Sequence, residues 1–167
     1  MNEEGLRRIE DALGRPLPQA FRHVMTTFPQ ELIDEAVKTG SDGEKRIDFM
    51  IISPDVEAIL AGIAHYQSEP GWPRHYVVVG ENGCGEVYSV DVSQQKCPVF
   101  ASGPHNDAGA HSPSEEGYFE QVSADLRGWV ASLVQQASYR AAGGNPIEQI
   151  QQLLDELKGK DSPGTIP

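Results

Sequence analysis

Carboxylates lie on both sides of a short glycine-rich run, and they are the side chains in this sequence most capable of chemistry. Residues 69–91 contain four acidic side chains and one basic side chain, which gives a local net charge of −3. Such carboxylates could form an acid–base pair, bind a cation or attract a basic partner. Acid–base catalysis needs two groups held at a defined separation, which spacing across a turn does not establish. No catalytic residue is therefore predicted, and the chain is not expected to be an enzyme.

The glycine-rich run itself, Gly80-Glu81-Asn82-Gly83-Cys84-Gly85, has some likeness to a phosphate-binding loop. Such loops hold phosphate with backbone N–H groups at the start of a helix, often with a lysine nearby. Here the following residues are typical of a strand, the run contains no lysine, and Glu81 would repel phosphate. The pattern favours a hairpin turn in which glycine supplies positive φ angles.

Two further groups of reactive side chains are weak candidates. No Cys–His–Asn or Cys–His–Asp arrangement can be assigned around Cys84. In a hairpin, Cys84 and Cys97 would lie roughly 20 Å apart, too far for a disulfide. A later loop carries four potential metal ligands, His105, Asp107, His111 and Glu115. Metal sites usually place their ligands on rigid elements, which a loop rich in Gly, Pro and Ser does not offer, so no metal ligand and no cofactor is predicted.

The remaining interpretation of this region is a protein-binding surface. Aromatic side chains dominate binding hot spots, and Trp72 lies in a turn flanked by prolines, where it is either an interface anchor or a lid over the sheet edge. Loops at the edge of a rigid sheet are also where binding residues gather. We predict a partner-binding face composed of Glu69, Trp72, Glu81, Asn82, Glu86 and Asp91.

Overall composition narrows the class of partner. The 167 residues include 13 basic and 25 acidic side chains, a formal net charge of −12. Nucleic acids and anionic membranes attract clustered Lys and Arg, so neither is expected as a partner. A basic protein would suit this charge, although the charge could also serve solubility alone. Neither a secretory leader nor an apolar run of membrane-spanning length is visible, and two cysteines make no disulfide framework. A cytoplasmic location is expected.

Hydrophobic periodicity predicts the first elements that must position this face. An amphipathic helix is predicted from about Asn2 to Leu13, a second after Pro18, and a short third one after Pro29. Thr39 to Gly43 is a loop by composition. Alternating apolar residues then predict one strand from Arg46 to Ile52.

The second half of the chain predicts a sheet between two helices. Ser53 and Pro54 have the residue types of an N-cap and a first helical position, and the apolar face of that helix includes Val56 and Ile63. Short loops imply that three antiparallel strands follow, His75–Val79, Glu86–Val92 and Cys97–Ala101. After an exposed polar loop, Ser102 to Gly117, we expect a strand from Tyr118 to Val122. Ser123 then caps a helix in which Trp129 belongs to the core.

Three segments together resemble the SMI1/KNR4 family, also called the SUKH superfamily. They are IEDALGRPLPQAFRHVMTTF (Ile9–Phe28), VVVGENGCGEVYSVDVSQQKCPVF (Val77–Phe100) and the closing helix within Val122–Leu133. The resemblance implies an α+β fold with one SMI1/KNR4-like domain over residues 1–140, built on a central antiparallel sheet with packed helices. Residues 141–167 would form a linker, an extra C-terminal helix from about Pro146 to Lys158 and a disordered end.

The resemblance also implies how such a chain would act. Bacterial members of the family are commonly immunity proteins that bind and block toxins, whereas fungal members are regulatory interaction proteins. We expect a non-enzymatic protein-binding domain, an immunity protein whose cognate partner is a basic toxin domain. The alternative is an intracellular regulatory module without a toxin partner. Monomer and homodimer both remain open, because the apolar stripe of the C-terminal helix could pack on its own domain or on a second copy.

Overall fold

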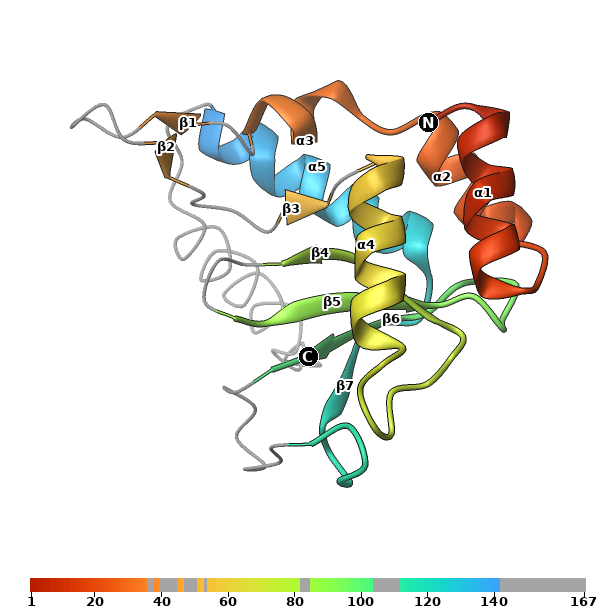
Figure 1. The fold of residues 1–167 in the computed structure, drawn as a ribbon. Coiled ribbons are helices and arrows are strands. Elements are labelled where there is room, and N and C mark those ends of the chain that lie inside the picture. The colour runs from red at the N-terminus through yellow and green to blue at the C-terminus, as the bar shows by residue number, and fades with distance from the viewer. Residues whose placement is uncertain are drawn as a thin grey trace, which may run out of the picture.

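Five antiparallel strands form the central sheet in the order β3-β4-β5-β6-β7, so that neighbours in the sheet are also neighbours in strand order (Figure 1). The structure is a computed structural model that describes residues 1–35, 38–39, 45–46, 51–52, 54–81, 85–103 and 112–141. The strands are β3 (Ile51–Ile52), β4 (Tyr76–Glu81), β5 (Val87–Asp91), β6 (Val99–Ser102) and β7 (Phe119–Ser123). The meander predicted from the short connecting loops is confirmed.

Helices pack on both sides of this sheet, which gives the expected α+β fold (Figure 1). In the described residues they are α1 (Glu3–Leu13), α2 (Gln19–Thr26), α3 (Gln30–Glu35), α4 (Val56–Tyr66) and α5 (Leu126–Ala141). Two short strands, β1 (Lys38–Thr39) and β2 (Lys45–Arg46), pair with each other outside the main sheet. None of the described helices combines the length and the apolar character that crossing a bilayer requires.

Helices α4 and α5 cover opposite faces of the sheet. Val78 and Ser89 are cross-strand partners and share a face, and a methyl group added at Gly62 of α4 would lie 3.6 Å from the Cβ of Val78. Side chains alternate along a strand, so Tyr88 points to the other face, where its ring centroid is 5.5 Å from that of Trp129 in α5. Every residue of β5 is consequently buried, and α4 crosses in front of β4 and β5 in Figure 1.

One hydrophobic core joins the helices to the sheet, and α1 fixes the position of α4 within it. The largest fully buried side chains in the described residues include Phe21, Leu6, Ile9, Met25, Ile59 and Leu126. Helix α1 approaches α4 closely through Gly5, where an added Cβ would collide with Cγ2 of Val56. At the rim of this contact the guanidinium of Arg8 donates to both carboxylate oxygens of Glu57, at 2.6 and 3.1 Å.

The five helices predicted within the described residues are confirmed, but two of their predicted caps are wrong. Helix α4 starts after Asp55, whose carboxylate accepts a hydrogen bond from the Ala58 amide at 2.8 Å, and not after Ser53. Helix α5 starts after Asp125, which accepts from the Gly128 amide at 2.6 Å, whereas the predicted cap, Ser123, ends β7. Aspartate and serine cap helices about equally well, so a sequence holding both does not say which one the helix uses.

The single strand predicted from Arg46 to Ile52 is described only at its two ends, which pair with different strands. Arg46 pairs with Lys38 in the separate ribbon, while Ile51 and Ile52 pair with Glu81 and Gly80 of the main sheet. Residues 47–50 lie outside the described residues. Thr39, expected in a loop, belongs to β1. Alternation of apolar residues indicates extended backbone, but it does not identify the neighbouring strand.

The predicted hairpin around the glycine-rich run is confirmed, with one irregularity. Strands β4 and β5 pair in antiparallel fashion, and Gly85 has a φ of 92°. The pairing passes from Val78 with Ser89 directly to Gly80 with Tyr88, so Val79 is an extra residue in a β-bulge. The predicted C-terminal helix, from about Pro146 to Lys158, lies outside the described residues.

Candidate functional site

A groove of about 320 Å³ lies between α4 and the β4–β5 hairpin. Helix α4 contributes Ala58, Ile59, Gly62 and Tyr66, and the hairpin contributes residues 78–81 and Val87. Most of these side chains are apolar, and Tyr66 and Glu81 are the exceptions. We call this feature the α4–β4 groove.

The bulge in β4 shapes the wall of the α4–β4 groove. Regular alternation would send Val78 and Val79 to opposite faces of the sheet. At the bulge both of these consecutive residues line the groove. After the bulge Glu81 pairs with Val87, which also lines the groove, so the Glu81 carboxylate stands on the side of the sheet that α4 covers.

Gly62 gives the α4–β4 groove part of its width. Glycine in a helix interior costs about 0.5–1 kcal/mol of stability relative to alanine, and packing can justify that cost, as it does at Gly5. Packing does not require a glycine at position 62. An added Cβ there would lie 3.6 Å from the Cβ of Val78 and 4.0 Å from the Val78 carbonyl oxygen, which are ordinary contacts. The glycine therefore leaves space that the fold itself does not need.

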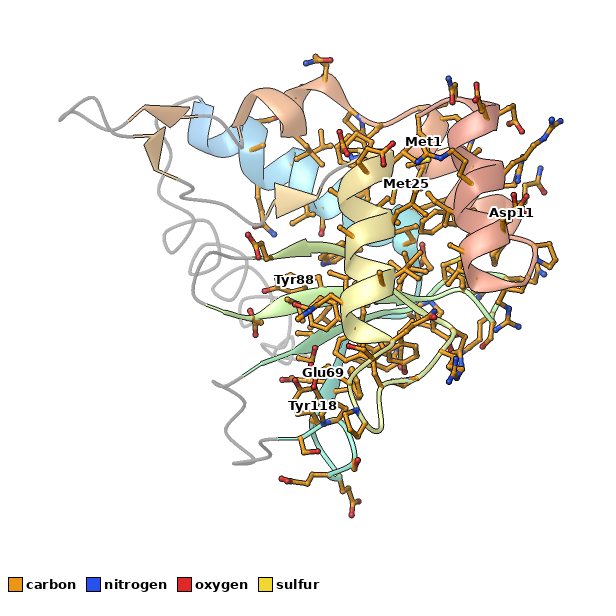
Figure 2. The ribbon with its side chains drawn as sticks, in the orientation of Figure 1. Met1, Asp11, Met25, Glu69, Tyr88 and Tyr118 are labelled. Carbon is orange, nitrogen blue, oxygen red and sulfur yellow. The ribbon has the colours of Figure 1, made fainter. Side chains whose placement is uncertain are left out.

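Two exposed carboxylates stand near the tyrosine at the end of the α4–β4 groove. Burial raises the pKa of Tyr66, and the negative charges of Glu81 and Glu69 raise it further. Burial and the charge of Glu69 likewise raise the pKa of Tyr118, and Figure 2 shows Glu69 and Tyr118 at the same end of the molecule. This end of the groove therefore has a negative potential, provided by side chains that are 12 positions apart in the sequence.

Trp72, predicted as a contact residue or a lid, is buried within the fold. Only 6% of it is exposed. Its rings lie 4.5 Å from Tyr66 and 5.1 Å from Phe119, measured between centroids. The prolines that flank Trp72 turn the chain so that the indole covers the aromatic residues on the α4 side of the sheet. The expectation that Trp72 is a surface anchor is therefore corrected.

Asp91 is likewise absent from the expected face. It is 4% exposed and accepts hydrogen bonds from the Ser93 amide at 2.8 Å, the Ser93 hydroxyl at 2.5 Å and the Gln94 side chain at 2.6 Å. These bonds hold the turn between β5 and β6. At about 3.3 Å per residue, Asp91 lies roughly 13 Å along β5 from Val87. Its role is structural, which corrects its assignment to the binding face.

The structural role of Asp91 has a measurable pH dependence. Burial would raise its pKa, but hydrogen bonds from Ser93 and Gln94 outweigh burial and hold the pKa below the usual range. The stabilisation is then fully present above the unfolded-state pKa of about 3.9 and is lost as pH falls through the lower folded-state pKa. Replacing Asp91 with asparagine should lower the free energy of unfolding by about 1–3 kcal/mol at pH 7.

Urea unfolding of both proteins at several pH values tests this prediction, with Asp11→Asn on the exposed side of α1 as the control. The difference in stability between wild type and Asp91→Asn should shrink as the pH falls below about 4. A difference that stays constant from pH 7 to pH 3 would show that the ionised carboxylate contributes nothing to the turn.

The other predicted binding residues divide between two sides of the hairpin. Glu86 is half-buried and accepts a hydrogen bond from the Tyr88 hydroxyl, on the side that α5 covers. Burial, followed by this bond, raises the pKa of Tyr88. Asn82 lies outside the described residues. The structure thus brings Glu69 and Glu81 together around Tyr66 and separates them from Glu86.

Of the reactive side chains considered from the sequence, the described ones, Cys97 and Glu115, do not line the α4–β4 groove. Cys97 is a free, buried thiol, and burial raises its pKa to about 11. Cys84 lies outside the described residues, as do three of the four potential metal ligands, His105, Asp107 and His111. Across the part of the chain that the structure describes, no three His, Cys, Asp or Glu side chains are grouped so as to hold a metal ion.

Of the residues that line the groove, sequence reasoning predicted only Glu81 as a binding residue, and it missed Gly62 and Tyr66 of α4. Both stand on a helix whose apolar stripe was assigned to the core, although a glycine inside that stripe was a usable signal.

Comparisons with known proteins give one match. A model of the SMI1/KNR4 family (SUKH-1) matches residues 1–132, which include both sides of the α4–β4 groove. Curated proteins and solved structures gave no match.

Proposed function

We propose, from the premise that this chain belongs to the SMI1/KNR4 family (SUKH-1), that it acts without catalysis by binding another protein. Its specific role in this proposal is that of an immunity protein, which binds a cognate bacterial toxin and neutralises it. The observation that carries the proposal is the α4–β4 groove, whose apolar walls end beside the exposed carboxylate of Glu81.

Apolar walls beside a charged rim suit a protein partner. Interfaces bury an apolar centre and keep polar groups at the rim, and the groove together with Glu81 and Glu69 has this composition. The formal net charge of −12 favours a basic toxin domain as the partner, because complementary charge speeds encounter and disfavours acidic competitors.

The proposed role is tested by capture followed by rescue. The tagged wild-type chain is used as bait in lysate of the native host, with the tag alone as control, and proteins held only by the chain are identified. Each candidate is then expressed in a susceptible bacterium with and without this chain. We expect growth to be inhibited by the candidate alone and restored by co-expression of the wild-type chain. In purified form, inhibition of the toxin should be complete near a 1:1 molar ratio, as binding without turnover requires.

Two outcomes would reject the immunity role. A captured protein that is harmless when expressed alone would favour the alternative, a regulatory interaction module. A toxin whose activity is unaffected by a molar excess of this chain would show that binding does not neutralise it. Inhibition at far below stoichiometric amounts would instead indicate that the chain is an enzyme.

A further inference from the structure

The walls of the space beside Gly62 are mostly apolar. Val78 and Val87 face it from the hairpin, and Ala58 faces it from α4. An added methyl group at Gly62 would fit against Val78, so the fold would accept alanine there and gain helix propensity from it. A glycine that packing does not require is expected where something outside the fold occupies the space.

The polar residues that line this space suggest which side chain would occupy it. Tyr66, the last residue of α4, and Glu81 both line the α4–β4 groove, and the charges of Glu81 and Glu69 both act on the Tyr66 hydroxyl. An occupant that follows the walls therefore needs an aliphatic stem and a positively charged head. Lysine and arginine both bury apolar stems while their charged heads remain near water.

Arginine fits these features better than lysine. Its planar guanidinium stacks on aromatic rings and presents several N–H donors to carboxylates, whereas the lysine ammonium is a compact and strongly hydrated charge. Tyr66 offers a half-buried ring, and Glu81 offers an exposed carboxylate next to it.

We propose that the α4–β4 groove receives an arginine side chain of the partner protein, with its stem along Gly62 and Val78 and its guanidinium between Tyr66 and Glu81. That the arginine comes from a partner protein rests on the proposed function. The capacity of the groove for an arginine side chain can be measured without any partner.

The test uses a short synthetic probe, acetyl-Gly-Val-Arg-Val-Gly-amide, titrated into the ¹⁵N-labelled full chain and followed by NMR. Saturable shifts are expected at the amides of Gly62, Val78 and Glu81. A matched peptide with citrulline, which keeps the shape of arginine without its charge, should bind about tenfold more weakly. The lysine peptide should bind about threefold more weakly than the arginine peptide, because it lacks the planar stacking group.

Two protein variants and one control connect the binding to the groove. Gly62→Ala should weaken binding of the arginine peptide about fivefold or more. The melting temperature of this variant should be unchanged or higher, since alanine favours the helix. Glu81→Gln should weaken binding of the same peptide about fivefold, because the negative charge is lost. Asp11→Asn removes the same charge from the exposed side of α1 and should leave the affinity unchanged.

The proposal is overturned by shifts that fall outside the groove, by equal binding of the citrulline peptide, or by unchanged affinity in Gly62→Ala. Equal binding of the lysine peptide would overturn the assignment to arginine. These outcomes are separate from those of the rescue experiment. A negative titration with successful rescue rejects the arginine site alone, whereas a positive titration without rescue rejects the immunity role alone.

Discussion

Replacing Phe21 with alanine is expected to lower the free energy of unfolding by about 3–5 kcal/mol, the range seen when a buried phenylalanine is truncated. Phe21 is 0% exposed and heads the fully buried side chains when these are ordered by size. It lies on α2 within the single core that also contains residues of α1, α4 and α5. Its removal would leave a cavity where these helices meet the sheet, and most domains are stable by only about 5–15 kcal/mol.

Urea unfolding at pH 7 measures this effect, and Phe28→Ala is the matched control. Phe28 follows α2 and packs only partly buried against the same core, so its truncation should cost clearly less. If the two variants lose equal stability, or if Phe21→Ala loses less than about 1 kcal/mol, Phe21 is not a central residue of the core.

Reversing the charges of Glu69 and Glu81 to lysine is expected to slow association with the captured partner by about 10- to 100-fold at low salt. Both carboxylates are exposed and both act on Tyr66 at the end of the α4–β4 groove. The association rate of the wild type should fall steeply as ionic strength rises, because the screening length drops to about 8 Å at 0.15 M. Stopped-flow measurements from low to high salt give both results.

A matched control separates local charge from total charge. Glu4→Lys with Asp11→Lys alters two exposed carboxylates on α1 and changes the formal net charge from −12 to −8, as the first double variant also does. The rate at which this control variant associates with the captured partner should remain close to that of the wild type. Equal slowing by both double variants would show that net charge governs encounter and that the groove has no special part in it.

Periodicity predicted the amphipathic helices at the start of this fold because each buries one face and exposes the other. Leu6 and Ile9 repeat at helical spacing and are fully buried, and Trp129 is in the core as expected. The same signal is weak where strands are two residues long, as at Arg46 and Ile51, because so short a strand contains no repeat.

Burial of individual polar and aromatic residues was harder to predict. Trp72 and Asp91 have the residue types of a binding surface, yet both are buried. Trp72 packs against Phe119, which is distant in sequence, and Asp91 accepts hydrogen bonds from the turn that follows it. The α4–β4 groove could not be predicted either. It exists only where a helix packs across a hairpin, and the spacing of Gly62 and Val78 in the sequence does not reveal that they meet.

If the α4–β4 groove binds a partner as proposed, the bulge at Val79 links the length of β4 to the choice of partner. In β4, Val79 has no pairing partner in β5, whereas Val78 and Gly80 on either side of it do. Deleting one residue at this point would therefore leave both of these pairs intact. Such a deletion would restore regular alternation and remove one of the two consecutive valines that line the groove. Relatives one residue shorter in this strand should therefore keep the fold but recognise different partners, and alignment gaps at this position would sort the family by what its members bind.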